Sequence, residues 1–208
     1  MGLRKKILIG MTLLILVMSA EANTFITNSY ITVQERISTY NGVAGGSYVG
    51  QFSNKWMDRS FWIFALPDMA GKTLVSATFR VSLALVDGAA NDVDLYHIQD
   101  LNHGDPLVTN DFNAGTATLV KASFVTPSSV VGYYSVDVLN EILSDYSFDS
   151  SGERYAVFRA QLEGDEKISG TANRRYNFIS NNNNTNPDQP ELILEITEGR
   201  SISLIIVH

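Results

Sequence analysis

The sequence predicts an all-β protein, an antiparallel β-sandwich of the jelly-roll type with one short helix. Two apolar runs between residues 59 and 85 flank a turn-rich segment, Pro67–Lys72. The second run has apolar side chains at every other position, at Phe79, Val81, Leu83 and Leu85. Alternation with period two is typical of a strand with one buried face. Many further short apolar runs are separated by turn residues, which is typical of a sandwich.

The same pattern predicts the remaining elements in order. We expect one or two strands in 24–37 and further strands at 48–52, 60–66, 93–98, 118–125, 133–138, 153–162, 176–179 and 190–197. In the strand 153–162, Ala156 and Phe158 share one face, and Tyr155 and Arg159 the other. Helical spacing predicts a short helix over 138–146, with Asp137 as its N-cap. Loops are expected at 41–47, 53–58, 99–117 and 181–190, because these segments are polar and rich in turn residues.

The two ends of the chain differ in composition from the domain between them, because each contains an uninterrupted apolar run. Three basic residues precede an unbroken apolar stretch over 7–18, and small residues follow at Ala20 and Ala22. This predicts a secretory signal peptide over 1–22, with an uncleaved N-terminal anchor as the alternative. Residues 23–200 then form one β-sandwich domain, as expected for this length. Residues 201–208 form an apolar tail that either completes a sheet edge or pairs with another molecule.

Composition narrows the classes of partner. Cleavage after Ala22 leaves 12 basic and 21 acidic residues, a net charge of −9. Nucleic acid is therefore not an expected partner, because phosphate binding requires a basic surface. The chain has no cysteine, which excludes disulfides and thiolate metal sites. We expect a secreted protein, either extracellular or at the cell surface.

Several segments together resemble a known family. The Arg59-Ser60 opening leads into a strand that ends Phe64-Ala65-Leu66-Pro67, followed by Gly71-Lys72-Thr73-Leu74-Val75-Ser76-Ala77-Thr78-Phe79-Arg80-Val81. Later segments agree, at 132–138, 155–162, 178–180 and 190–194. In this order they are similar to secreted DNRLRE-domain β-sandwiches, close to carbohydrate-binding modules of the alginate-binding type, over about 31–197. The chain departs from the pattern at Leu139, where Thr is common, and at Asn181-Asn182, where Arg-Glu is common.

The resemblance implies polysaccharide binding and helps to orient one strand. In these modules the Phe of Phe-x-Leu-Pro packs inward; if Phe64 does so, Arg59 and Phe61 point outward. Aromatic rings stack on sugars and guanidinium groups pair with carboxylates. Strand parity also directs Arg80, Tyr155 and Arg159 outward, and Trp56 lies in the loop 53–58. The candidate ligand-binding set is therefore Arg59, Phe61, Arg80, Tyr155, Arg159 and Trp56. The alternatives are a loop-borne site with Trp56, Arg174, Arg175 and Tyr176, or an ordinary solvated face.

One acidic turn is a candidate metal site. Its oxygen ligands, of the type that Ca²⁺ prefers, are Asp87, Asn91, Asp92 and Asp94. Their spacing is not that of an EF-hand, so a solvated turn is the alternative. None of the three histidines lies at metal-ligand spacing, and we expect His97 to be packed or exposed at a strand edge.

These observations favour a non-catalytic secreted module that binds polysaccharide, including acidic uronic-acid glycans. The first alternative is a structural or adhesive protein of the matrix or cell surface that self-assembles through residues 201–207. A polysaccharide lyase or hydrolase is the third reading, because any two strands can bring a pair of carboxylates together.

Overall fold

The computed structural model describes residues 23–27, 31–36, 41–44, 47–52, 56–89, 91–99, 112–113, 115–148, 154–164, 173–179 and 188–198, the first three segments, Trp56 and Glu198 by their backbone alone. These residues form twelve strands and one helix. The strands are β1 Asn23–Thr27, β2 Ile31–Arg36, β3 Asn41–Ala44, β4 Ser47–Phe52, β5 Trp56–Ala65, β6 Lys72–Asp87, β7 Val93–Gln99, β8 Thr116–Val125, β9 Gly132–Asp137, β10 Tyr155–Leu162, β11 Arg174–Phe178 and β12 Glu191–Glu198, and the helix is α1 Leu139–Phe148.

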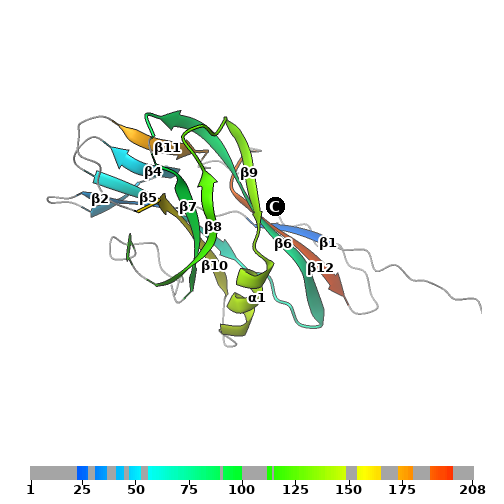
Figure 1. The fold of residues 1–208 in the computed structure, drawn as a ribbon. Coiled ribbons are helices and arrows are strands. Elements are labelled where there is room, and N and C mark those ends of the chain that lie inside the picture. Colours follow the sequence, from blue (N-terminus) through cyan, green and yellow to red (C-terminus); the bar gives the residue numbers. More distant parts are fainter. Residues whose placement is uncertain are drawn as a thin grey trace, which may run out of the picture.

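The strands form a curled antiparallel sheet with the order β1-β12-β6-β11-β4-β5-β10-β7-β8, in which β9 also pairs with β6, and β2 joins β3 to β5. The two halves of this sheet face each other, with β1, β12, β6 and β9 in one layer and β5, β10, β7 and β8 in the other (Figure 1). Strands β11 and β4 connect the layers at one end. The prediction of an all-β sandwich is therefore confirmed.

Aromatic rings fill the space between the layers. The ring of Phe79 on β6 lies 4.9 Å from Phe158 on β10 and 5.3 Å from Trp62 on β5. Strand β6 pairs with neither of these strands, so the contacts cross the interior from one layer to the other. The predicted inward position of Phe64 is confirmed, since its ring lies 6.0 Å from that of Phe79. Large aromatic rings dominate the energetics of such cores.

The turn-rich segment 66–71 carries the chain between the layers. The Lys72 N–H donates to the Met69 carbonyl at 2.9 Å, and the Ala70 N–H donates to the Asp68 carboxylate at 3.0 Å. Gly71 has φ +73°, a left-handed conformation that glycine adopts without steric cost. The two long strands predicted on either side of the turn are therefore opposed across the core rather than paired.

The alternation along β6 holds only in part. Phe79, Val81 and Leu83 are buried as predicted, but the prediction is wrong for Leu85, which is 48% exposed. The pairing with β11 explains the difference: Leu83 lies opposite Phe178 but Leu85 lies opposite Asn177, so one extra residue interrupts the ladder. Such a β-bulge reverses the faces beyond it.

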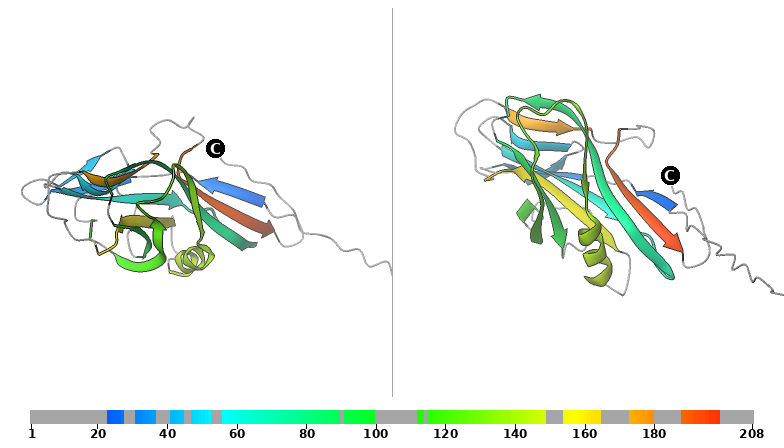
Figure 2. Two further views of the ribbon diagram at one scale, coloured as in Figure 1. Left: turned by 45° about the horizontal axis from the view of Figure 1, so that its top comes forward. Right: turned by 45° about the vertical axis from the view of Figure 1, so that its right-hand side comes forward.

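The predicted helix is present as α1. It begins one residue later and ends two residues later than the predicted range 138–146. The Asp137 carboxylate accepts the Leu139 N–H at 3.0 Å, in agreement with its predicted capping role. Helix α1 packs against β6 and β10 at one end of the sandwich (Figure 2). Ile142 is buried, and the Tyr146 hydroxyl donates to the Pro67 carbonyl at 2.9 Å. In the described part of the chain, no helix is long and apolar enough to span a membrane.

Two predicted loops contain strands. Residues 41–44 form β3, paired with β2, and β5 begins at Trp56 inside the segment predicted as a polar connection. Polar strands of this kind have no apolar alternation for a sequence argument to detect. The predicted signal peptide 1–22 and the tail 201–208 lie outside the described residues, as do 100–111 of the long polar loop.

Candidate functional site

The predicted ligand-binding face separates into two parts. In β5 and β10, Phe61 lies directly opposite Arg159, and Arg59 lies two residues before Phe61. These three side chains therefore belong to one face, as predicted. Arg80 belongs to the other layer, where β6 pairs with β12 and β9. The sequence could not place the two groups, because strand order is a tertiary property.

The first group is buried, and the expectation that it faces solvent is wrong. Phe61 is 0% exposed, and Arg59 and Arg159 are each 6% exposed. Two described residues of the long loop, 112 and 113, lie over Arg59. The Arg59 guanidinium is 4.0 Å from the centre of the Phe112 ring, and its Nη1 donates to the Phe112 carbonyl and, at 2.8 Å, to the Asn113 side chain. We call Arg59, Phe61, Tyr96, Phe112 and Arg159 the arginine cluster.

Within the arginine cluster, Arg159 lies between two rings. Its guanidinium carbon is 5.6 Å from the centre of the Tyr96 ring on β7 and 6.0 Å from that of Phe61 on β5. Burial lowers the pKa of Arg159, against a smaller opposing effect of Tyr96. Its Nε is buried and has no hydrogen-bond partner in the described part of the chain.

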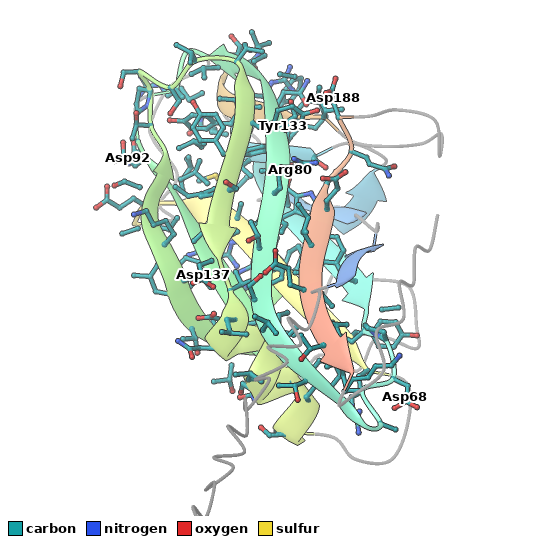
Figure 3. All side chains as sticks on the ribbon, turned by 90° about the vertical axis from the view of Figure 1, so that its right-hand side faces the viewer. Asp68, Arg80, Asp92, Tyr133, Asp137 and Asp188 are labelled. Carbon is teal, nitrogen blue, oxygen red and sulfur yellow. The ribbon has the colours of Figure 1, made fainter. Side chains whose placement is uncertain are left out.

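The second group lies on the open outer face of β9, β6 and β12. Strand register aligns Ser135, Arg80 and Glu191 in one row across these strands. Thr78 lies between Asp137 and Ile193 in the next row. Tyr133 is on the same face of β9 and is 51% exposed. We call this surface the Tyr133 face; Figure 3 shows Tyr133, Arg80 and Asp188 close together on it, with Asp137 further along β9.

Polar contacts hold the Tyr133 ring in place. The Arg80 guanidinium carbon lies 5.0 Å from the ring centre, and the Tyr133 hydroxyl donates to the Asp188 carboxylate. That hydrogen bond is the main cause that raises the pKa of Tyr133. Arg80 in turn forms an ion pair with Glu191 through Nη2, and its Nε donates to the same carboxylate at 2.7 Å. The predicted set included Arg80 but missed Tyr133, although the period-two alternation of Tyr133, Ser135 and Asp137 indicates an outward face.

Two predicted residues lie elsewhere. Tyr155 is half-buried, packs against the core and lies opposite Ala65. Trp56 is the first residue of β5, and its side chain lies outside the part of the chain that the structure describes.

The predicted Ca²⁺ site is not assembled. No three acidic or histidine side chains among the described residues form a group that could hold a metal. Asp87 instead approaches Arg175 at 3.6 Å, and the Asn91 side chain donates to the Glu163 carbonyl. Asp92 contributes its backbone carbonyl to the Glu163 N–H. The Asp94 carboxylate accepts the N–H of Ser123, which has φ +49° in an irregular part of β8. Asp94 thus stabilises a strand irregularity.

His97 is packed, one of the two predicted outcomes, and it has a partner that the sequence did not indicate. It is buried, and its Nε2 lies 2.9 and 3.0 Å from the two oxygens of Asp145 on α1. Burial raises the pKa of Asp145, and the hydrogen bond to His97 opposes that rise. The pair connects the helix to β7.

The alternative site is not borne by a loop, because Arg174, Arg175 and Tyr176 lie in strand β11. Tyr176 is buried, and its hydroxyl donates to the Asn91 carbonyl. The Arg175 guanidinium lies 4.8 Å from the Tyr48 ring and 4.7 Å from the Phe52 ring. Register places Arg175 opposite Gly50, and Gly50 opposite the buried Asp58. Arg175 is therefore engaged with aromatic rings and nearby carboxylates.

Fold and surface together define an all-β sandwich that carries the exposed Tyr133 ring on a polar strand face and a buried arginine cluster in the opposite layer. No protein-family model matches the chain, and no curated protein matches it in sequence.

Proposed function

We propose that this protein is a secreted, non-catalytic module that binds polysaccharide through the Tyr133 face. The observation that supports the proposal is the half-exposed Tyr133 ring, which Arg80 and Asp188 hold over the outer face of β9. A ring fixed in this way can stack on a sugar without a large loss of side-chain entropy. The resemblance to carbohydrate-binding modules supports the same function.

Polar side chains around the ring supply the hydrogen bonds that a sugar requires. Ser135 and Thr78 lie in adjacent rows of the face, and hydroxyl groups both donate and accept hydrogen bonds. Arg80 and Glu191 occupy the row of Ser135. The strands of this layer are held in register on both sides of β6, so these groups have fixed relative positions.

The charge of the face indicates the kind of polysaccharide. Glu191 pairs with Arg80, and Asp137, Asp188 and Glu195 add negative charge nearby. This surface repels a uronic-acid polymer and is compatible with a neutral one. We therefore propose neutral polysaccharides as the preferred ligands of the Tyr133 face, and acidic polysaccharides become the comparison in the experiment.

The test is affinity electrophoresis of wild type and of Tyr133→Ala against neutral and uronic-acid polysaccharides. Loss of the stacked ring should weaken binding to the neutral polymer by about tenfold, since an aromatic contact contributes about 1 kcal/mol or more. Leu85→Ala is the matched control, because Leu85 is equally exposed, on β6, but lies beyond the bulge. Equal retardation of wild type and Tyr133→Ala, or no retardation of wild type by any polysaccharide, would exclude this site.

Secretion is a separate part of the proposal. The basic start, apolar run and Ala-x-Ala pattern support cleavage after Ala22. Intact-mass measurement of the exported protein should give a chain that begins at Asn23, and a chain that retains Met1 would contradict the signal peptide.

A further inference from the structure

The Tyr133 ring extends across strand β6. Tyr133 on β9 lies opposite Ser82 on β6, and its hydroxyl donates to Asp188, which precedes β12 on the other side of β6 (Figure 3). Ser82 lies between the buried Val81 and Leu83 and so faces outward, yet it is only 5% exposed, as expected beneath a ring. The ring therefore presents its other face to solvent, and a sugar can stack on that face.

Arg80 lies beside this ring on the same strand. It precedes Ser82 by two residues, so both side chains point to the same face of β6. The Arg80 guanidinium carbon is 5.0 Å from the centre of the Tyr133 ring. This distance places the guanidinium next to a sugar that stacks on the ring, within reach of the hydroxyl groups at the edge of that sugar.

Glu191 fixes the orientation of the guanidinium. Arg80 Nε donates at 2.7 Å to one oxygen of the Glu191 carboxylate, and Arg80 Nη2 donates to the same oxygen. Because Nε and Nη2 form one edge of the guanidinium, Nη1 and the second N–H of Nη2 form another edge, which is directed away from Glu191. That edge carries two parallel donors in a rigid plane. The Arg80 side chain is 36% exposed, so a ligand can approach it from solvent.

The charges on the face decide which ligand fits this edge. Two parallel donors match two neighbouring oxygen atoms, as in a carboxylate. Two hydroxyl groups on adjacent carbons of a sugar offer a similar pair, since a hydroxyl oxygen accepts hydrogen bonds. Glu191 already neutralises the charge of Arg80, and Asp188 and Asp137 add negative charge to the face. The neutral hydroxyl pair therefore fits better than a carboxylate.

We propose, given that the Tyr133 face binds polysaccharide as proposed above, that Arg80 determines its specificity by donating to two adjacent hydroxyl groups of the sugar stacked on Tyr133. Glu191 is a positioning residue, because it acts through Arg80. A hexose unit linked through its first and fourth carbons keeps free hydroxyls on the adjacent second and third carbons. Linkage through the first and third carbons leaves no adjacent pair. The face should therefore prefer the first kind of polymer.

The experiment is affinity electrophoresis against a soluble neutral glucan of each linkage. Wild type should bind the polymer with adjacent hydroxyls about tenfold more tightly, a factor that two hydrogen bonds readily supply. Arg80→Met should lose this preference, and Arg80→Lys, which keeps the charge without the fork, should lose most of it. Lys121→Met is the matched control, because it removes the same charge from β8 in the other layer and should keep the preference. A thermal melt of each variant checks that it is folded.

Glu191→Gln tests the positioning role. It keeps an oxygen acceptor but no longer neutralises Arg80, so it should reduce the linkage preference and raise binding to a uronic-acid polymer relative to wild type. A purely structural role of Glu191 would leave the linkage preference of the folded variant unchanged.

The outcomes separate this inference from the proposed function. If Tyr133→Ala weakens glucan binding but Arg80→Met and Arg80→Lys keep the wild-type linkage preference, the role of Arg80 is overturned and the proposed function is unaffected. A wild type that prefers the uronic-acid polymer, with that preference lost in Arg80→Met, would mean that the edge takes a carboxylate and would also overturn the proposal. No retardation of wild type by any polysaccharide would overturn the proposed function itself, and this specificity with it.

Discussion

Asp58 offers the sharpest test of the interior electrostatics. Its side chain is 1% exposed, and neither carboxylate oxygen has a hydrogen-bond partner within the described residues. Burial raises the pKa of Asp58 from 3.8 to about 7, although the charge of Arg175 opposes the rise. Desolvation therefore outweighs the ion attraction here. Asp58→Asn removes the charge and keeps the shape.

The sign of the effect follows from the two pKa values. Below about pH 4, Asp58 is protonated in both the folded and the unfolded protein, and its stabilising contribution is complete. As the pH rises toward 7, the folded protein keeps the proton that the unfolded chain has lost, so stability falls. Above pH 7 the loss is constant. The rise of the Asp58 pKa from 3.8 to about 7 corresponds to a loss of at most about 4 kcal/mol in the free energy of unfolding.

Urea unfolding monitored by tryptophan fluorescence at pH 4, 5, 6, 7 and 8 measures this effect. We expect Asp58→Asn to match wild type near pH 4 and to exceed its free energy of unfolding by several kcal/mol at pH 8. Asp68→Asn is the control, because Asp68 is an exposed carboxylate in the turn before β6. A difference between wild type and Asp58→Asn that stays constant from pH 4 to pH 8 would refute the reasoning.

Three further predictions concern packing. Gly50→Ala should destabilise by about 1–3 kcal/mol or more, because Gly50 has φ +120° and a Cβ would lie 2.3 Å from the Arg174 carbonyl oxygen; Gly164→Ala, with open space around it, should cost less in the same thermal melt. Phe79→Ala should cost about 3–5 kcal/mol in urea unfolding, against about 0.5 kcal/mol for the exposed Leu85→Ala, and similar losses would mean that the ring stack does not form the core. Asp145→Ala removes the partner of His97 and should increase hydrogen exchange in α1 more than elsewhere; uniform exchange would contradict a local role for the pair.

Strand and helix positions could be predicted where local chemistry is strong. The alternation at Phe79, Val81 and Leu83 and the capping of α1 by Asp137 both agree with the structure. The alternation failed at Leu85, because a bulge depends on the partner strand. Strand β3 was missed because its pairing partner, rather than its own residues, holds it in the sheet.

The candidate sites depended far more on the fold. Parity correctly assigned Arg59, Phe61 and Arg159 to the side of their strands opposite Phe64 and Phe158, but parity does not reveal that another segment covers that side. The exposure of Tyr133 and the ion pair between Arg80 and Glu191, 111 residues apart in sequence, likewise follow from the arrangement of β9, β6 and β12.

The sequence by itself determined the fold class, the position of the helix and the buried face of β6 as far as Leu83, because periodicity is a local property of neighbouring side chains. Tertiary structure alone decided which arginines became buried, which carboxylates became partners and that the Tyr133 ring remained open to solvent. Those outcomes depend on contacts between residues far apart in the chain, and on the free energy of removing each charge from water once such contacts form.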